Sequence, residues 1–185
     1  MKVKVLMLLS CIALCAFGAA QTVRVNRNGN TENLNKVRPG SAVNSQDRSF
    51  FKVALETNLL EIKLGELAQR KGNSEFVREY GMMMVREHTM GFNELKVIGG
   101  KTRLPVSKNL SSASQNAIAR LARLSGAAFD NAYRAEMIKG HNAFLIKLEQ
   151  EIKRGNNSLI RNYAVTAAPV VRLHGKMAER RVTKI

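Results

Sequence analysis

The sequence predicts an all-α protein, built as an antiparallel four-helix bundle with one additional short helix. The first observation behind this prediction is that apolar residues recur at helical spacing over four long segments from Ser45 onward. The second is that turns rich in glycine and asparagine, at 72–73 and 155–157, divide these segments into two pairs. The third is their matched length of about 26 to 28 residues, since short turns between such helices make them antiparallel neighbours.

Capping and helix-breaking residues predict the boundaries of each element. Asn44 or Ser45, together with Asp47, can cap the start of the first helix. Ser112 and Gln115 have the spacing of a capping box at the start of the short helix. The expected elements, in order, are a helix from 45 to the turn at 72–73, a helix to the glycines at 99–100, a crossing loop at 104–105, a short helix over 112–124, a helix over 126–154 and a last helix to the C-terminus. We expect the short helix to lie across one end of the bundle.

The N-terminal part of the chain predicts export. Residues 1–20 combine a short basic start, an apolar stretch and small residues before Gln21, which is the layout of a secretory signal peptide. Both cysteines lie in this segment, so no disulfide is expected in the mature chain. Residues 21–44 are polar and rich in asparagine and predict a disordered linker, followed by the bundle domain over 45–185. We therefore expect a protein of the periplasm, or one associated with the outer membrane, with no transmembrane segment in the mature chain.

The chain is strongly basic, with a formal net charge of +16. Such a charge favours contact with anionic envelope components, although a solvated basic surface without a specific ligand is the simpler interpretation. The chain has no tryptophan and no aromatic ladder on which bases could stack, so no specific nucleic-acid partner is expected. The sequence leaves the oligomeric state open.

One polar side chain occupies the inner face of each long helix, when residues are placed about 100° apart around the helix axis. Glu61 lies among small residues, opposite a charged stripe. His88, His141 and His174 each lie among apolar residues, and they are all the histidines of the chain. Buried carboxyl and imidazole groups need partners, because burying them unpaired costs several kcal/mol. The sequence therefore predicts four potential metal ligands inside one bundle.

With the turns at 72 and 155 expected at one end of the bundle, residue counts from them order these groups along its axis as Glu61, His141, His88 and His174, in steps of roughly 3 to 4.5 Å. On this count one ion reaches three of the four groups, or all four join in a hydrogen-bonded chain with water. Met84 and Met137 each precede a histidine by one helical turn and are additional candidate ligands. Imidazole with thioether suits copper, whereas imidazole with carboxylate suits zinc or iron.

Three functions remain open for such a chain. The cluster can bind a transition metal in a protein without catalytic activity, or it can be a structural polar core inside a protein that binds anionic surfaces. The third is a metal-dependent redox enzyme. A di-iron oxidase is disfavoured, because Val85, Ile138 and Val171 stand three residues before the histidines, where that chemistry places glutamates.

Several motifs resemble the domain-of-unknown-function 4142 family, exported bacterial proteins often labelled predicted outer membrane protein. The resemblance extends over most of residues 45–180 and implies a ferritin-like bundle and export, with no established reaction. The family often has aspartate where this chain has Glu87, a residue expected to point away from the inner face. The matching stretches are Phe51-x-x-Ala54, Glu61-x-x-Leu64-Gly65-x-Leu67-Ala68, Met84-Val85-Arg86-Glu87-His88, Leu104-Pro105, Leu124-Ser125-Gly126-Ala127-Ala128-Phe129-Asp130-x-x-Tyr133, Met137-x-x-x-His141 and Pro169-x-x-x-x-His174.

Overall fold

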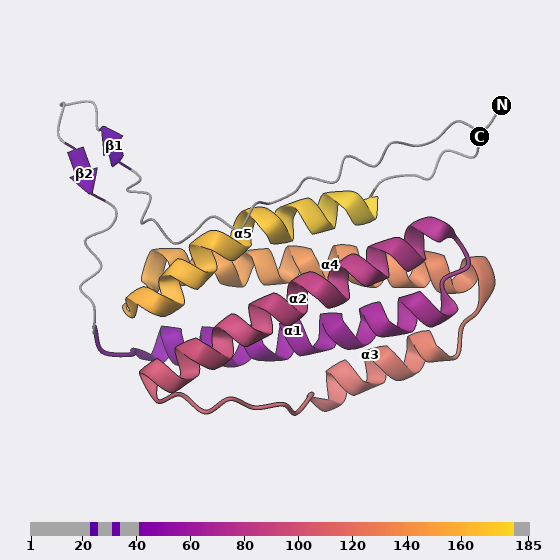
Figure 1. The fold of residues 1–185 in the computed structure, drawn as a ribbon, viewed down its shortest axis with the longest axis horizontal. Coiled ribbons are helices and arrows are strands. Elements are labelled where there is room, and N and C mark those ends of the chain that lie inside the picture. Colours follow the sequence, from indigo (N-terminus) through magenta and orange to yellow (C-terminus); the bar gives the residue numbers. More distant parts are fainter. Residues whose placement is uncertain (1–22, 26–30, 34–40, 180–185) are drawn as a thin grey trace. The chain divides into compact units, whose positions relative to one another are not determined.

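A computed structural model describes residues 23–25, 31–33 and 41–179 of the chain. The predicted signal peptide, residues 1–20, lies outside the described residues. The helices are α1 (Ser45–Lys71), α2 (Glu75–Thr102), α3 (Ser112–Ala122), α4 (Gly126–Arg154) and α5 (Ser158–Glu179). The all-α prediction, with four long helices and one short one, is confirmed for the domain that they form (Figure 1).

A small hairpin precedes the helical domain and forms a unit of its own. Strands β1 (Val23–Val25) and β2 (Thr31–Asn33) pair antiparallel, with Arg24 opposite Glu32. They lie within the segment expected to be a disordered linker, so these residues differ from that expectation. Valine and threonine favour extended backbone, and the intervening sequence is rich in the asparagine and glycine typical of hairpin turns.

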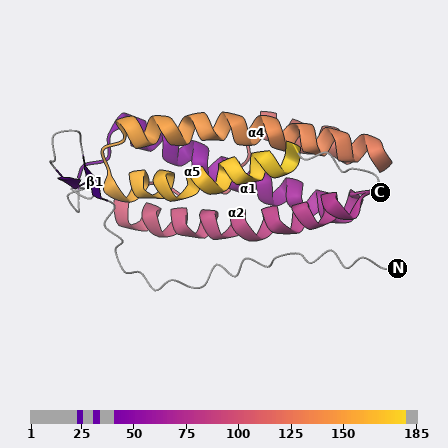
Figure 2. The same cartoon turned by 90° about the horizontal axis from the view of Figure 1, so that it is seen from above.

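The four long helices pack as two antiparallel pairs. α1 packs on α2 and on α4, and α5 packs on α4 and on α2 (Figures 1 and 2). The α1–α2 contact is close because two glycines face each other: a Cβ added at Gly65 would lie 2.7 Å from the carbonyl oxygen of Gly81. None of the described helices is both long and apolar enough to cross a membrane.

Two buried aspartates connect the two helix pairs, and each of them binds the turn that joins the helices of the other pair. Asp47 completes a capping box with Asn44 and also accepts hydrogen bonds from the backbone N–H groups of Asn156 and Asn157, in the α4–α5 turn. At the opposite end, Asp130 accepts from the backbone N–H groups at 73 and 74, in the α1–α2 turn. These bonds satisfy N–H groups at helix starts that would otherwise lack partners.

The short helix α3 lies along the side of α1, where it also contacts α4, rather than across one end of the bundle (Figure 1). Ser114 at its start donates to the Glu56 carboxylate, and the Lys71 ammonium donates to the carbonyl of Ala122 at its end. Leu121, fully buried, joins the core from this helix. These attachments to two places along α1 hold α3 parallel to it.

The apolar core consists of two clusters. The first apolar cluster includes Phe50, Phe51, Phe92, Phe144 and Tyr163. The second includes Leu64, Met84, Phe129, Tyr133 and Met137. Along each long helix, the predicted polar residue falls between the residues of the two clusters. A polar layer therefore separates the two halves of the core.

The buried face of α5 differs from the expected one. The helical spacing of apolar residues in the sequence places Ala167 and Val170 beside His174 on the inner face, but Val170 is 39% exposed. The buried residues are instead Ala168 and Val171. The face is therefore rotated, and His174 lies near its edge instead of at its centre. Pro169 lies inside this helix, on its exposed side.

Candidate metal centre

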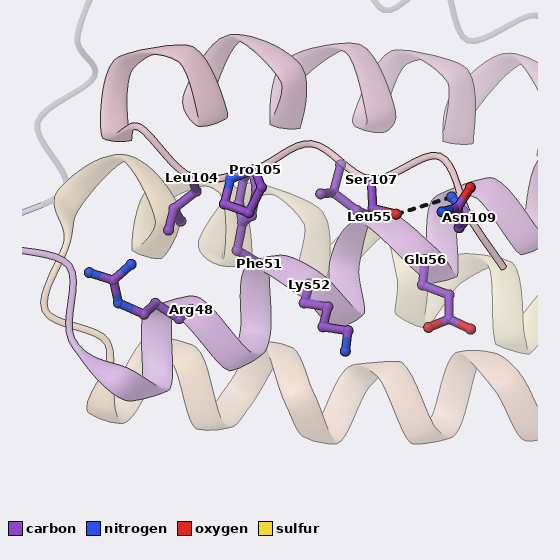
Figure 3. A pocket seen from close by; sticks show the side chains of 9 residues that line it. All are labelled: Arg48, Phe51, Lys52, Leu55, Glu56, Leu104, Pro105, Ser107 and Asn109. Carbon is purple, nitrogen blue, oxygen red and sulfur yellow. Dashed lines mark hydrogen bonds between the residues drawn. The ribbon is translucent and has the colours of Figure 1, made fainter. Parts of the chain in front are cut away.

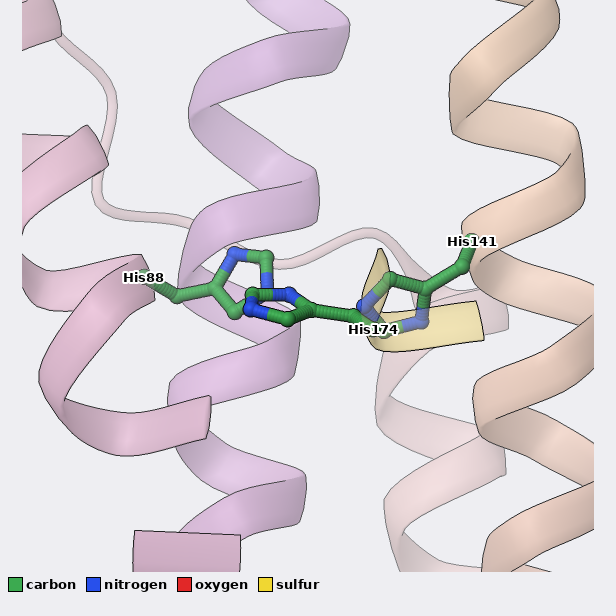
Figure 4. Close-up of side chains that lie close together, drawn as sticks. All are labelled: His88, His141 and His174. Atoms are coloured by element: carbon green, nitrogen blue, oxygen red, sulfur yellow. The ribbon is translucent and has the colours of Figure 1, made fainter. Parts of the chain in front are cut away.

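Three imidazole rings meet in the polar layer. His88 comes from α2, His141 from α4 and His174 from α5, and all three are buried (Figure 4). Their ring centroids are 5.4 to 5.8 Å apart, at angles between 56° and 80°. One ring nitrogen of each histidine lies within 4.8 Å of those of the other two. We call these three residues the histidine trio.

In each ring of the trio, one nitrogen lies within hydrogen-bonding distance of a residue outside the trio. His88 Nδ1 lies 3.0 Å from Asn58 Oδ1, and the amide nitrogen of Asn58 donates to the Ala54 carbonyl and to the Tyr163 hydroxyl. His141 Nδ1 lies 2.8 Å from the Met137 carbonyl. Because both partners are acceptors, Nδ1 carries the proton in both rings. Such outer hydrogen bonds fix the tautomer and orientation of metal-binding histidines.

The third ring is held by a carboxylate. His174 Nε2 lies 2.8 Å from Glu87 Oε2, while the other oxygen of Glu87 accepts from Arg86 at 3.0 Å. The hydrogen bond from His174 lowers the pKa of Glu87, with a smaller contribution from Arg86, so Glu87 is ionised at neutral pH. The backbone carbonyl of His174 accepts from the Tyr80 hydroxyl, which ties α5 to α2 a second time.

The remaining nitrogens of the trio have no partner among the described residues. They are His88 Nε2, His141 Nε2 and His174 Nδ1, all of them buried. A buried polar atom without a hydrogen bond is normally costly, and here three lone pairs converge on one place. Three neutral imidazoles form a common ligand set for a divalent transition metal, at metal–nitrogen distances of about 2.0 to 2.1 Å for zinc. The donor set, its orientation and its outer partners therefore fit a metal ion.

The electrostatics keep two rings of the trio neutral. Burial lowers the pKa of His88 well below its usual value, and the neighbouring rings of His141 and His174 add to this. Burial likewise lowers the pKa of His141 to about 4, against the opposing effect of its bond to Met137. Imidazole binds metal only in its neutral form, so these two ligands need no deprotonation at neutral pH.

Glu61 is adjacent to the trio but is not part of it. Its Oε1 lies 3.9 Å from His141 Nδ1, the nitrogen that already bonds to Met137, and its Oε2 has no partner among the described residues. Burial raises the pKa of Glu61 to about 8, so this carboxyl is neutral at pH 7. The structure thus brings together three of the four predicted ligands and places Glu61 behind one of them.

The three histidines lie closer together along the bundle axis than was predicted from the sequence. The count took the turns at 72 and 155 to lie at one end of the bundle, but they lie at opposite ends, where Asp130 and Asp47 bind them (Figure 1). His88 lies 13 residues from the start of α2 at Glu75, and His141 lies 15 residues from the start of α4 at Gly126, at the same end, so the two rings are nearly level and pack 5.8 Å apart. His174, which was counted from the opposite end, lies in the same layer and packs against both rings.

Met84 and Met137 are both fully buried in the second apolar cluster. Met137 takes part in the centre through its backbone carbonyl, which holds His141. Thioether ligation by either residue stays a prediction.

Two residues of the centre were not predicted from the sequence. Asn58 lies one helical turn before Glu61 on the same face of α1, so the helical periodicity could have revealed it. Glu87 was expected to point away, and the correction is that it reaches His174 on α5. Nothing in the α2 sequence indicates this contact, because it depends on the rotated face of α5.

Gly91 is needed for the orientation of His88, and Gly91→Ala is expected to lower both stability and metal affinity. An added Cβ would lie 2.6 Å from Asn58 Oδ1, the atom that accepts from His88. The amide cannot move without losing its three hydrogen bonds, so we expect a loss of about 1 to 3 kcal/mol in unfolding free energy. Urea unfolding and metal titration of both proteins measure these effects.

The matched control is Gly100→Ala, in the same helix. A Cβ there would meet nothing within 4 Å. Alanine favours the helix over glycine by about 1 kcal/mol, so the control should be as stable as the parent or more so. Equal behaviour of the two variants would contradict the role of Gly91.

A pocket lies elsewhere, between α1 and the loop after α2. Figure 3 shows Phe51, Leu104 and Pro105 meeting at this pocket of about 350 Å³. Glu56 on its border is already held by Ser111 and Ser114, whose hydrogen bonds lower its pKa. The pocket contains no histidine and does not reach the trio.

Comparisons with known proteins agree with the helical fold. The model of the family described as Domain of unknown function (DUF4142) matches residues 33–180. The chain belongs to the DUF4142 family. A search of curated proteins finds no match for this DUF4142 protein. Among solved structures, a DUF305 fragment from Deinococcus radiodurans is similar, with a TM-score of 0.67 and 13% identity over 75% of this chain and 95% of that one. At this identity the likeness concerns the fold alone.

Proposed function

We propose that this DUF4142 protein binds one divalent transition-metal ion through His88, His141 and His174. The observation that carries the proposal is the convergence of three buried imidazole nitrogens that lack any other partner. Neutral imidazoles suit zinc, copper and iron, and a bound ion would supply Lewis-acid character. The chain itself orients the three rings through Asn58, the Met137 carbonyl and Glu87.

The ionised Glu87 supports binding of a dication, because it offsets positive charge next to His174. The ligands are only 2 to 4% exposed, which favours retention of a metal over exchange of a substrate. We therefore propose a metal-binding protein without catalytic activity, with a metal-dependent redox enzyme as the alternative.

The proposed location is the cell envelope. The N-terminal sequence has the layout of a signal peptide, and the basic composition suits contact with anionic envelope components. Binding of the protein to anionic vesicles that weakens as salt is added would support this second proposal. Equal binding to neutral vesicles would contradict it.

Metal uptake by the full chain tests the proposed function. Protein stripped with a chelator and titrated with Co²⁺ or Zn²⁺ should bind one ion per chain. Co²⁺ should show the absorption of a nitrogen-coordinated ion, and competition with Cu²⁺ and Fe²⁺ ranks the metals. Stripped, folded protein that takes up none of these ions would refute the proposal.

A further inference from the structure

Of the three groups that hold the histidine trio from outside, Glu87 is the one that reaches solvent. The Asn58 side chain is 2% exposed, and Met137 is fully buried. The Glu87 side chain is 27% exposed. A metal ion that approaches from solution therefore meets Glu87 before it meets the other two.

Glu87 also lies one imidazole ring away from the convergent nitrogens. Its Oε2 is 2.8 Å from His174 Nε2, and the other nitrogen of that ring is one of the three without a partner. His174 lies near the edge of the buried face of α5. The Glu87–His174 pair thus links the protein surface to the trio, with no other side chain between the carboxylate and that ring.

The carboxylate of Glu87 itself supplies the negative charge that favours capture of a cation at this place. A chain with a formal net charge of +16 repels cations in general, so a local carboxylate matters for their approach. A hydrated ion must lose water ligands before it can enter a protein site, and a carboxylate oxygen can replace one of them. Arg86 competes for the same carboxylate at 3.0 Å, but its side chain is 69% exposed and free to swing away.

We propose that Glu87 is the capture site through which a divalent metal ion enters the trio, with His174 as the ligand that takes it over. The proposal rests on the proposed metal binding and adds its route and its rate-controlling residues. Arg86 releases the Glu87 carboxylate, and the freed oxygen coordinates the incoming ion. The His174 ring then turns to pass the ion inward. Arg86 then acts as a brake on uptake, because it must release Glu87 first.

The rate of Co²⁺ uptake tests this route. Stopped-flow mixing of Co²⁺ with the stripped full chain gives the association and dissociation rate constants of each variant. Glu87→Gln keeps an oxygen that can accept from His174 but removes the charge. Its matched control is Glu149→Gln, an exposed glutamate that is also paired with an arginine, Arg172, at 3.3 Å and touches no histidine. Arg86→Gln and its control Arg172→Gln test the brake.

We expect Glu87→Gln to lower the association rate constant about tenfold or more, as the loss of a steering charge does, and Glu149→Gln to leave it within about twofold. Arg86→Gln should raise the association rate constant, and Arg172→Gln should not. The deficit of Glu87→Gln should shrink as salt is added.

A Glu87→Gln protein that loses affinity only through faster dissociation would overturn the proposal, since Glu87 would then merely orient His174. If Glu87→Gln does not fold, an unchanged association rate in Arg86→Gln overturns it. A wild-type chain that binds no Co²⁺ refutes the metal site itself, which is a different outcome from binding at equal rates.

Discussion

His141→Ala is expected to abolish the metal-dependent rise in melting temperature of the stripped protein. Wild-type protein should gain stability by mass action when metal binds the folded state alone, about 4 kcal/mol at a metal concentration of a thousand times Kd. His141 supplies one of three convergent nitrogens, and its ring contacts both other histidines. Calorimetry with and without Zn²⁺ measures the effect.

The control is Asn142→Ala, at the next residue, whose side chain is exposed. This variant should keep the full metal-dependent rise. His141→Ala should also melt at a lower temperature without metal, because it leaves a cavity and removes the hydrogen bond from the ring to the Met137 carbonyl. A drop in stability without any metal dependence in the wild type would leave the polar layer a purely structural one.

Glu151→Gln is expected to remove a pH dependence of stability that the wild type shows between about pH 4.5 and 7. Burial raises the pKa of Glu151 from 4.5 to about 7, and a hydrogen bond to Asp47 adds to this. At Glu151 the folded state therefore keeps a proton that the unfolded chain releases, so the contribution of this group to stability falls as pH rises through this window. The fall is about 1.4 kcal/mol per pH unit, or about 3 kcal/mol in all.

Urea unfolding at a series of pH values, with chelator present, measures this difference. The other titrating groups are common to both proteins, so the difference between the two curves isolates Glu151. The glutamine side chain can still donate a hydrogen bond to Asp47 and fill the same space. The Glu151→Gln protein should therefore become more stable than the wild type as pH approaches 8. Parallel curves for wild type and Glu151→Gln would contradict the prediction, whereas Glu149→Gln should follow the wild type.

Much of the fold follows from local signals in the sequence. The start of α1 at Ser45 and the ends of the helix pairs at the two turns were expected from capping residues and glycines, and the structure agrees. The inward position of His88 and His141 follows from the spacing of apolar residues, which carries the direction of each side chain around its helix.

The rest depends on how helices sit against one another, which periodicity does not contain. The rotated face of α5 exposes Val170 and brings His174 within reach of Glu87. The position of α3 along α1 follows from bonds between residues far apart in the sequence, such as Ser114 and Glu56. The predicted height order failed because the two turns lie at opposite ends of the bundle, and the local sequence does not determine at which end each turn lies.

The polar layer also fixes the axial register of the bundle. Leucine-rich helix faces tolerate sliding, because one apolar side chain replaces another at the interface. Here a slip of one helix by a single turn, about 5.4 Å, would push an imidazole or Asn58 into an apolar cluster and strip it of its hydrogen bonds. Misaligned packings of this chain are therefore disfavoured by unsatisfied polar groups, and the histidines select one alignment of four helices even before any ion arrives.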